Sequence, residues 1–176
     1  MPVRLILMRH AKSAWPDGVA DFDRPLAPRG QEAAPLMGRW LGKQPWKPDL
    51  VLVSAARRTR ETWAHVAPTL PGVDMEATPS IYAASAGSLL DLVRESGGAM
   101  VTLMLVGHNP GTQELAFGLA DPAAGDREAL RRLSRKYPTA GIAILEQDGG
   151  WKDVAPGSMR LSTFITPRAL GGIDED

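Results

Sequence analysis

The chain of 176 residues contains no cysteine, which excludes disulfide bonds, cysteine-ligated zinc and any thiolate nucleophile. Histidine is almost as scarce, because only His10, His65 and His108 occur. Lys+Arg and Asp+Glu both number 20, so the formal net charge is zero and we expect no nucleic-acid partner. Any histidine chemistry is therefore confined to three positions.

Long hydrophobic runs are also missing. The apolar segment Val3–Met8 ends at Arg9, far short of the roughly 20 residues that cross a bilayer, and no signal-peptide cleavage site follows it. We therefore expect a cytoplasmic protein with no membrane partner. The length, with 44% hydrophobic and 23% charged residues, fits one globular domain. We predict that this domain covers residues 1–170 and that residues 171–176 form a frayed tail.

Short apolar runs alternate with amphipathic ones along the chain. The apolar runs predict buried strands at residues 3–8, 49–54, 101–106 and 141–146. Helical spacing of apolar residues predicts helices within residues 31–41, 57–70, 89–93, 112–119 and 127–135. This alternation predicts a single-domain α/β fold with three layers, in which helices cover both faces of a mainly parallel central sheet.

Histidines and arginines directly follow three of the predicted strands. The first strand runs into Arg9 and His10, the second into the helix start that carries Arg58, and the third into His108 and Asn109. Ligands of open α/β sheets bind beyond the carboxyl ends of the strands, so we expect these side chains to share one site. His65 falls within a predicted helix and is assigned no chemical role.

This combination of residues favours a phosphoryl group as the ligand. Neighbouring arginine cations would repel a divalent metal ion, and no close acidic pair accompanies the two histidines. A phosphoryl dianion matches the arginine fork, and a neutral imidazole can act as a covalent nucleophile. The chain has neither a P-loop pattern nor a Mg²⁺-binding acidic cluster. We therefore expect no metal and no cofactor.

Several short motifs occur in a fixed order along the chain. Three of them are Arg9-His10-Ala11, Ser54-x-x-x-Arg58-x-x-x-Thr62 and Val106-Gly107-His108-Asn109. They resemble the motifs of the histidine phosphatase (phosphoglycerate mutase-like) superfamily. Segments 9–13 (RHAKS), 23–30 (DRPLAPRG) and 136–141 (KYPTAG) are similar to its small SixA-type phosphohistidine phosphatase branch, and the resemblance extends from about Arg4 to Arg168.

The resemblance implies a role for each matched residue. His10 would be the nucleophile that becomes phosphohistidine, while Arg9, Arg58 and His108 would hold the phosphoryl oxygens and stabilise the transition state. Asn109 would assist substrate binding by orienting the loop that carries His108. Ala11 replaces the usual glycine of the family, a replacement common in this branch, and the nucleophile should be unaffected.

The general acid of the family, usually a glutamate in an inserted lid, has no clear counterpart. Its absence suits a good leaving group such as imidazole, whereas a departing alkoxide needs a proton. The segment between Thr62 and the third predicted strand is short, which suggests an open groove that admits a protein-borne phosphate. Candidate acids that no motif places are Asp17, Asp21, Asp23, Glu76, Tyr82 and Glu95.

Three functions remain open at this point. The first is a phosphatase that acts through His10 on protein phosphohistidine or on another phosphate with a good leaving group. The second is a phosphatase of a small-metabolite phosphomonoester or phosphoanhydride. The third is a module that binds phosphoproteins without turnover, although binding alone needs cations and not a nucleophile. Mutase activity is disfavoured, because it needs a closed pocket that excludes water.

Overall fold

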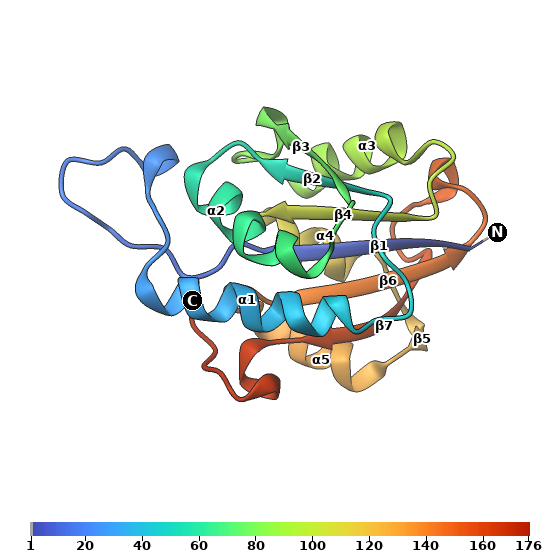
Figure 1. The fold of residues 1–176 in the computed structure, drawn as a ribbon. Helices are drawn as coiled ribbons and strands as arrows, with labels where there is room; N and C mark the ends of the chain where they lie inside the picture. The colour runs from blue at the N-terminus through green and yellow to red at the C-terminus, as the bar shows by residue number, and fades with distance from the viewer. Residues whose placement is uncertain (1) are drawn as a thin grey trace.

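The computed structural model describes residues 2–176, and its centre is a seven-stranded sheet in the order β3-β2-β4-β1-β6-β7-β5 (Figure 1). Five α-helices flank this sheet in the described part of the chain. The helices are α1 (Pro28–Gly42), α2 (Arg57–Val66), α3 (Ala86–Gly97), α4 (Gly111–Leu119) and α5 (Arg127–Arg135). The strands are β1 (Pro2–Arg9), β2 (Leu50–Ser54), β3 (Asp74–Thr78), β4 (Thr102–Gly107), β5 (Ala120–Gly125), β6 (Ile142–Asp148) and β7 (Met159–Ile165).

The sheet is mainly parallel, as the sequence predicts. Strands β1, β4, β2 and β3 form one continuous parallel set, and β5 pairs parallel with β7. Only β6 runs against its neighbours, because it pairs antiparallel with both β1 and β7. The parallel set brings the carboxyl ends of β1, β2 and β4 to one edge of the molecule.

Two apolar cores, one on each face of the sheet, confirm the three predicted layers. Successive side chains of β1 alternate between them, with Leu5 and Leu7 in one core and Ile6 and Met8 in the other. The first core also contains residues of α3, α4 and α5, and the second contains residues of α1 and α2. Helices therefore cover both faces, which is why the central strands are apolar throughout.

Strands β3, β5 and β7 do not follow from the apolar runs, and each has a physical reason. The edge strand β3 exposes most of its side chains and carries Asp74 and Glu76. Strand β5 contains Pro122, which cannot donate to a ladder. Strand β7 alternates buried and exposed residues and so lacks a continuous apolar run. No helix within residues 2–176 has the length and apolarity needed to span a membrane.

The tail, predicted to fray, makes contacts with the body of the protein. The Glu175 carbonyl accepts a hydrogen bond of 2.8 Å from the Thr139 amide, and its carboxylate lies 2.6 Å from Arg29. The Lys12 ammonium donates to the carbonyl of Asp176 at 2.9 Å. Acidic side chains of the tail thus pair with Arg29 in the first turn of α1 and with Lys136 after α5, which explains the difference from the prediction.

Candidate active site

The sheet order places the three predicted strand ends side by side. Strand β4 lies between β1 and β2, so His10 after β1 and His108 after β4 meet with their ring centroids 5.3 Å apart. A cavity of about 280 Å³ opens there. All five predicted site residues line it, namely Arg9, His10, Arg58, His108 and Asn109. Its other lining residues are Lys12, Ser13, Trp15, Arg24 and Asp176.

Backbone hydrogen bonds fix His10 at the end of β1. Its amide donates to the Gly107 carbonyl at 2.9 Å, and its carbonyl accepts from the Ala140 amide at 3.0 Å. The imidazole Nδ1 lies 2.7 Å from the Ala11 carbonyl, which can only accept. Nδ1 therefore carries the hydrogen, and Nε2 of the neutral ring keeps a free lone pair.

The electrostatics of the site keep His10 neutral. Burial lowers the pKa of His10 well below its usual value, since the charged ring would lose its hydration. The hydrogen bond to Ala11 opposes this shift, while nearby His108, Arg58 and Arg9 add to it. His10 as a whole is only 8% exposed. A buried imidazole among cations therefore retains its lone pair at neutral pH.

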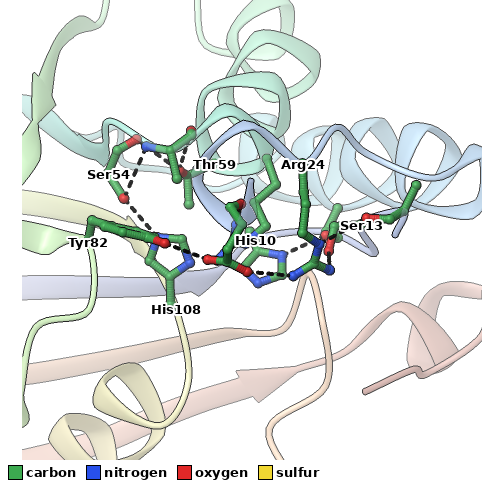
Figure 2. A network of polar contacts seen from close by, with 12 residues as sticks. His10, Ser13, Arg24, Ser54, Thr59, Tyr82 and His108 are labelled. Carbon is green, nitrogen blue, oxygen red and sulfur yellow. Dashed lines mark hydrogen bonds and ion pairs between the residues drawn. The ribbon is translucent and has the colours of Figure 1, made fainter. Parts of the chain in front are cut away.

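Ser54, the last residue of β2, positions the His108 ring. Its Nε2 lies 2.7 Å from the hydroxyl of the fully buried Ser54 (Figure 2). Burial and the Arg58 cation lower the pKa of His108 to about 4, so this ring is also neutral at pH 7. The second nitrogen, Nδ1, is buried and has no partner in the described structure.

Helix α2 connects the second sequence motif to the loop that follows His10. The Thr62 hydroxyl donates to the Arg58 carbonyl at 2.7 Å and accepts from the Ala11 amide at 3.0 Å. The three residues of this motif thus reach different parts of the site. Ser54 contacts His108, Thr62 contacts the Ala11 amide, and Arg58 lines the cavity. Arg57 and Arg60 are exposed on the outer face of α2, where Arg57 pairs with Glu61, as expected of solvated charges.

Sequence reasoning did not identify Asp21 as the centre of a charged network. Arg58 donates to the Asp21 carbonyl at 2.6 Å and to its carboxylate at 3.1 Å. The carboxylate also accepts from Arg24 at 2.9 Å and from the Tyr82 hydroxyl at 2.5 Å. These contacts span up to 61 residues, so local spacing could not reveal them. The DRPL motif, which contains Arg24, was the available signal.

This network sets the protonation states of two candidate acids, Asp21 and Tyr82. The Tyr82 hydrogen bond and the two arginines hold the pKa of Asp21 far below its usual range, so Asp21 is ionised and has no proton to give. The hydrogen bond to Asp21 raises the pKa of Tyr82, which keeps the phenol protonated. Asp21 and Tyr82 line a neighbouring pocket that shares Arg58, His108 and Asn109 with the cavity. The other candidates, Asp17, Asp23, Glu76 and Glu95, line neither of the two.

Unpartnered polar atoms gather in this one cavity. Within residues 2–176, the buried side-chain atoms without a hydrogen-bond partner are Arg9 Nε, Arg58 Nε, His108 Nδ1 and Asn109 Oδ1. Arg9 and Asn109 otherwise share the Tyr137 carbonyl, at 2.8 and 3.1 Å. Buried polar groups are rarely left unpaired, so the cluster fits a polar ligand. The described residues hold no group of three or more potential metal ligands.

Paired histidines and arginines at the carboxyl edge of a mainly parallel sheet fit the class of proteins that transfer phosphoryl groups. Comparison with known proteins gives the family. The model of the histidine phosphatase superfamily (branch 1) matches residues 5–96. An uncharacterized protein of Mycobacterium tuberculosis (strain H37Rv) is 45% identical over 163 residues, which cover 92% of this chain and all of that protein. The chain belongs to the histidine phosphatase superfamily.

Solved structures agree with this assignment. The candidate phosphohistidine phosphatase SixA from Nakamurella multipartitia is similar with a TM-score of 0.82 and 28% identity, over 95% of this chain and 97% of that one. The corresponding protein from Agrobacterium tumefaciens gives 0.77 and 31%, over 95% and 99%. The fold is that of the SixA-type members, and the family supports phosphatase activity.

Proposed function

We propose that this protein is a phosphatase that works through a phosphohistidine formed on His10, and that its substrate is protein phosphohistidine or another phosphate with a good leaving group. The observation that carries the proposal is the fixed tautomer of His10. Its Nδ1 hydrogen is committed to Ala11, so Nε2 is the free nucleophile. The named SixA relatives support the substrate class.

The first step transfers the phosphoryl group to the enzyme. The Nε2 lone pair of His10 attacks phosphorus, and the bond between phosphorus and the leaving group breaks with its electron pair on the leaving atom. Arg9, Arg58 and His108 offer unpartnered buried nitrogens around the phosphoryl oxygens. Asn109 shares the Tyr137 carbonyl with Arg9 and so aligns the loop after β4 with the end of β1.

The second step releases phosphate. Water attacks phosphorus, the bond from phosphorus to Nε2 breaks, its electron pair returns to His10, and the water proton passes to solvent. A phosphohistidine substrate loses imidazole without a strong acid if the distal nitrogen is already protonated. The ionised state of Asp21 is consistent with this preference, since an alkoxide would need a proton donor.

Trapping the labelled enzyme tests the nucleophile. We expect radiolabel from a phosphorylated substrate to stay on the denatured wild type at high pH, where phosphohistidine survives and phosphoserine mostly does not. His10→Ala should carry no label, whereas His65→Ala, which changes a histidine outside the cavity, should label normally. An unlabelled wild type or a labelled His10→Ala variant would sink the proposal. Turnover of an aryl phosphate separates the enzyme from a pure binding module.

A chelator tests independence from metal. The proposed chemistry uses only imidazole and guanidinium groups, so the wild type should keep full activity after dialysis against EDTA. Activity that disappears with EDTA and returns with a divalent cation would contradict the proposed chemistry. Comparing phosphohistidine protein with alkyl phosphates then decides between the protein substrate and a small metabolite, because the leaving groups differ in their need for a proton.

A further inference from the structure

Residues 14–24 form a loop that exposes large apolar side chains beside the site, and we call it the aromatic loop. It projects from the body of the protein at the carboxyl edge of the sheet (Figure 1, blue). Trp15 is 75% exposed, Val19 39% and Phe22 37%. In the described structure the other exposed large apolar residues, Met75, Val101, Phe117 and Ile173, lie on separate elements.

The apolar surface of the aromatic loop is continuous with the cavity. Trp15 lines the cavity and lies over the Arg24 guanidinium, 3.2 Å from it. On the other side a series of ring contacts leads outward from the site. The Tyr82 ring lies 5.6 Å from His108, and the Phe22 ring lies 5.0 Å from Tyr82. A molecule whose phosphoryl group reaches His10 would therefore meet these rings.

Hydrogen bonds fasten the loop although its apolar side chains point away from the core. Arg24 is buried and donates to the Ala14 carbonyl at 3.0 Å, to the Ser13 hydroxyl at 2.5 Å and to Asp21 at 2.9 Å. The Ala14 amide donates to the Pro25 carbonyl at 2.9 Å. The rings are thus presented on a fixed loop, and contiguous exposed apolar groups mark interaction surfaces.

The charge of the aromatic loop indicates the chemistry of what covers it. Asp17 and Asp23 are exposed, and neither forms an ion pair with another residue of segment 2–176. The cavity itself is lined by basic side chains. A matching surface would place its phosphoryl group in the cavity and its basic side chains against the two carboxylates.

We propose that the aromatic loop is the docking surface for the polypeptide that carries the phosphorylated side chain. Apolar side chains of that polypeptide would cover Trp15, Val19 and Phe22, and its basic side chains would face Asp17 and Asp23. The proposal rests on the proposed phosphatase function. A small metabolite bound by its phosphate in a cavity of about 280 Å³ would leave the outer rings uncovered.

Two substrates of different size test the docking surface. The first is free phosphohistidine, and the second is a protein phosphorylated on histidine with phosphoramidate, on a surface rich in apolar and basic residues. We expect the double variant Val19→Ala with Phe22→Ala, which changes two exposed residues outside the cavity lining, to lower kcat/KM for the protein by about tenfold, as for a tenfold loss of interface affinity. For free phosphohistidine, kcat/KM should stay within about twofold. Phe117→Ala, which removes an exposed ring on α4, is the matched control.

The outcomes separate the two proposals. Equal losses on both substrates would show that the rings support the site and do not dock a polypeptide, and an unchanged kcat/KM for the protein would also overturn the docking surface. In both cases the phosphatase proposal survives. A wild type that hydrolyses neither phosphohistidine substrate would overturn the phosphatase proposal itself and the docking surface with it. Asp17→Asn with Asp23→Asn should reduce the salt dependence for the protein substrate only.

Discussion

We expect the protonation of His10 to determine how the activity of the site depends on pH. In the proposed mechanism His10 must be neutral to attack phosphorus, and burial lowers its pKa well below the usual 6.5. The ring binds a proton only when the pH falls below that lowered pKa. Acid should therefore slow the reaction only at a lower pH than for an ordinary histidine. We expect phosphoenzyme formation with an aryl phosphate to change little between pH 8 and pH 6, measured by rapid quench. A rate that halves near pH 6.5 would contradict the buried geometry.

We expect Ser54 to affect the proposed reaction by orienting His108. Removing its fully buried hydroxyl in Ser54→Ala leaves His108 Nε2 without its 2.7 Å partner. We expect the free energy of unfolding to fall by about 1–3 kcal/mol. The ring would also lose its orientation, so kcat/KM should fall by about tenfold to a hundredfold. Denaturant unfolding and steady-state kinetics measure the two effects.

Thr59→Val supplies the control for that substitution. It removes another fully buried hydroxyl, one that donates to the Ser54 and Ala56 carbonyls and contacts no side chain of the site. Stability should fall in this variant while kcat/KM is retained. If Ser54→Ala behaves in the same way, Ser54 is a packing residue and not a positioning residue for His108.

At the scale of elements, the approach of helix α1 to the loop that follows His10 depends on Gly30. A Cβ atom at this position would clash with the Lys12 carbonyl oxygen. Gly30→Ala must therefore push the loop after His10 away from α1, and we expect a loss of about 1–3 kcal/mol in stability together with lower kcat/KM. Gly118→Ala in α4, where nothing lies within 4 Å, should instead gain up to about 1 kcal/mol. Thermal unfolding and kinetics of both variants check this difference.

The elements that sequence predicts well are those whose burial is complete. Strands β1, β2, β4 and β6 are covered on both faces, so their apolar runs are continuous, and the histidines that follow two of them could be placed at one edge. The edge strand β3 forms because it pairs with β2, and its own residues are not hydrophobic enough to predict it. Asp21 and Tyr82 join the site only through tertiary contacts, which a linear pattern does not encode.

At the scale of the whole molecule, a net charge of zero conceals a strongly basic cavity. Four cationic side chains line it, those of Arg9, Lys12, Arg24 and Arg58, and the only acidic lining residue among those described is Asp176. Asp21, which forms ion pairs with Arg24 and Arg58, offsets part of this positive charge. Composition therefore could not reveal the anion preference, whereas the positions of Arg9 and Arg58 after β1 and β2 could.

Inorganic phosphate should stabilise the whole fold through this cavity. A ligand that binds only the native state at a hundred times its Kd adds about 2.7 kcal/mol, which corresponds to a rise in Tm of about 5–10 °C for a chain of this size. We expect that rise for the wild type and for Arg57→Ala, and little of it for Arg58→Ala. Calorimetry at fixed ionic strength measures the shift, and equal shifts in all three proteins would place the phosphate elsewhere.

The position of the tail has a practical consequence for anyone who produces the protein. Asp176 lines the cavity, and its carbonyl accepts a hydrogen bond from Lys12 in the loop that follows His10. The amino end of β1 lies at the opposite side of the sheet (Figure 1). An affinity tag or fluorescent fusion attached after Asp176 would emerge at the mouth of this cavity and obstruct a large substrate, whereas one attached at the amino end of the chain would leave that entrance clear.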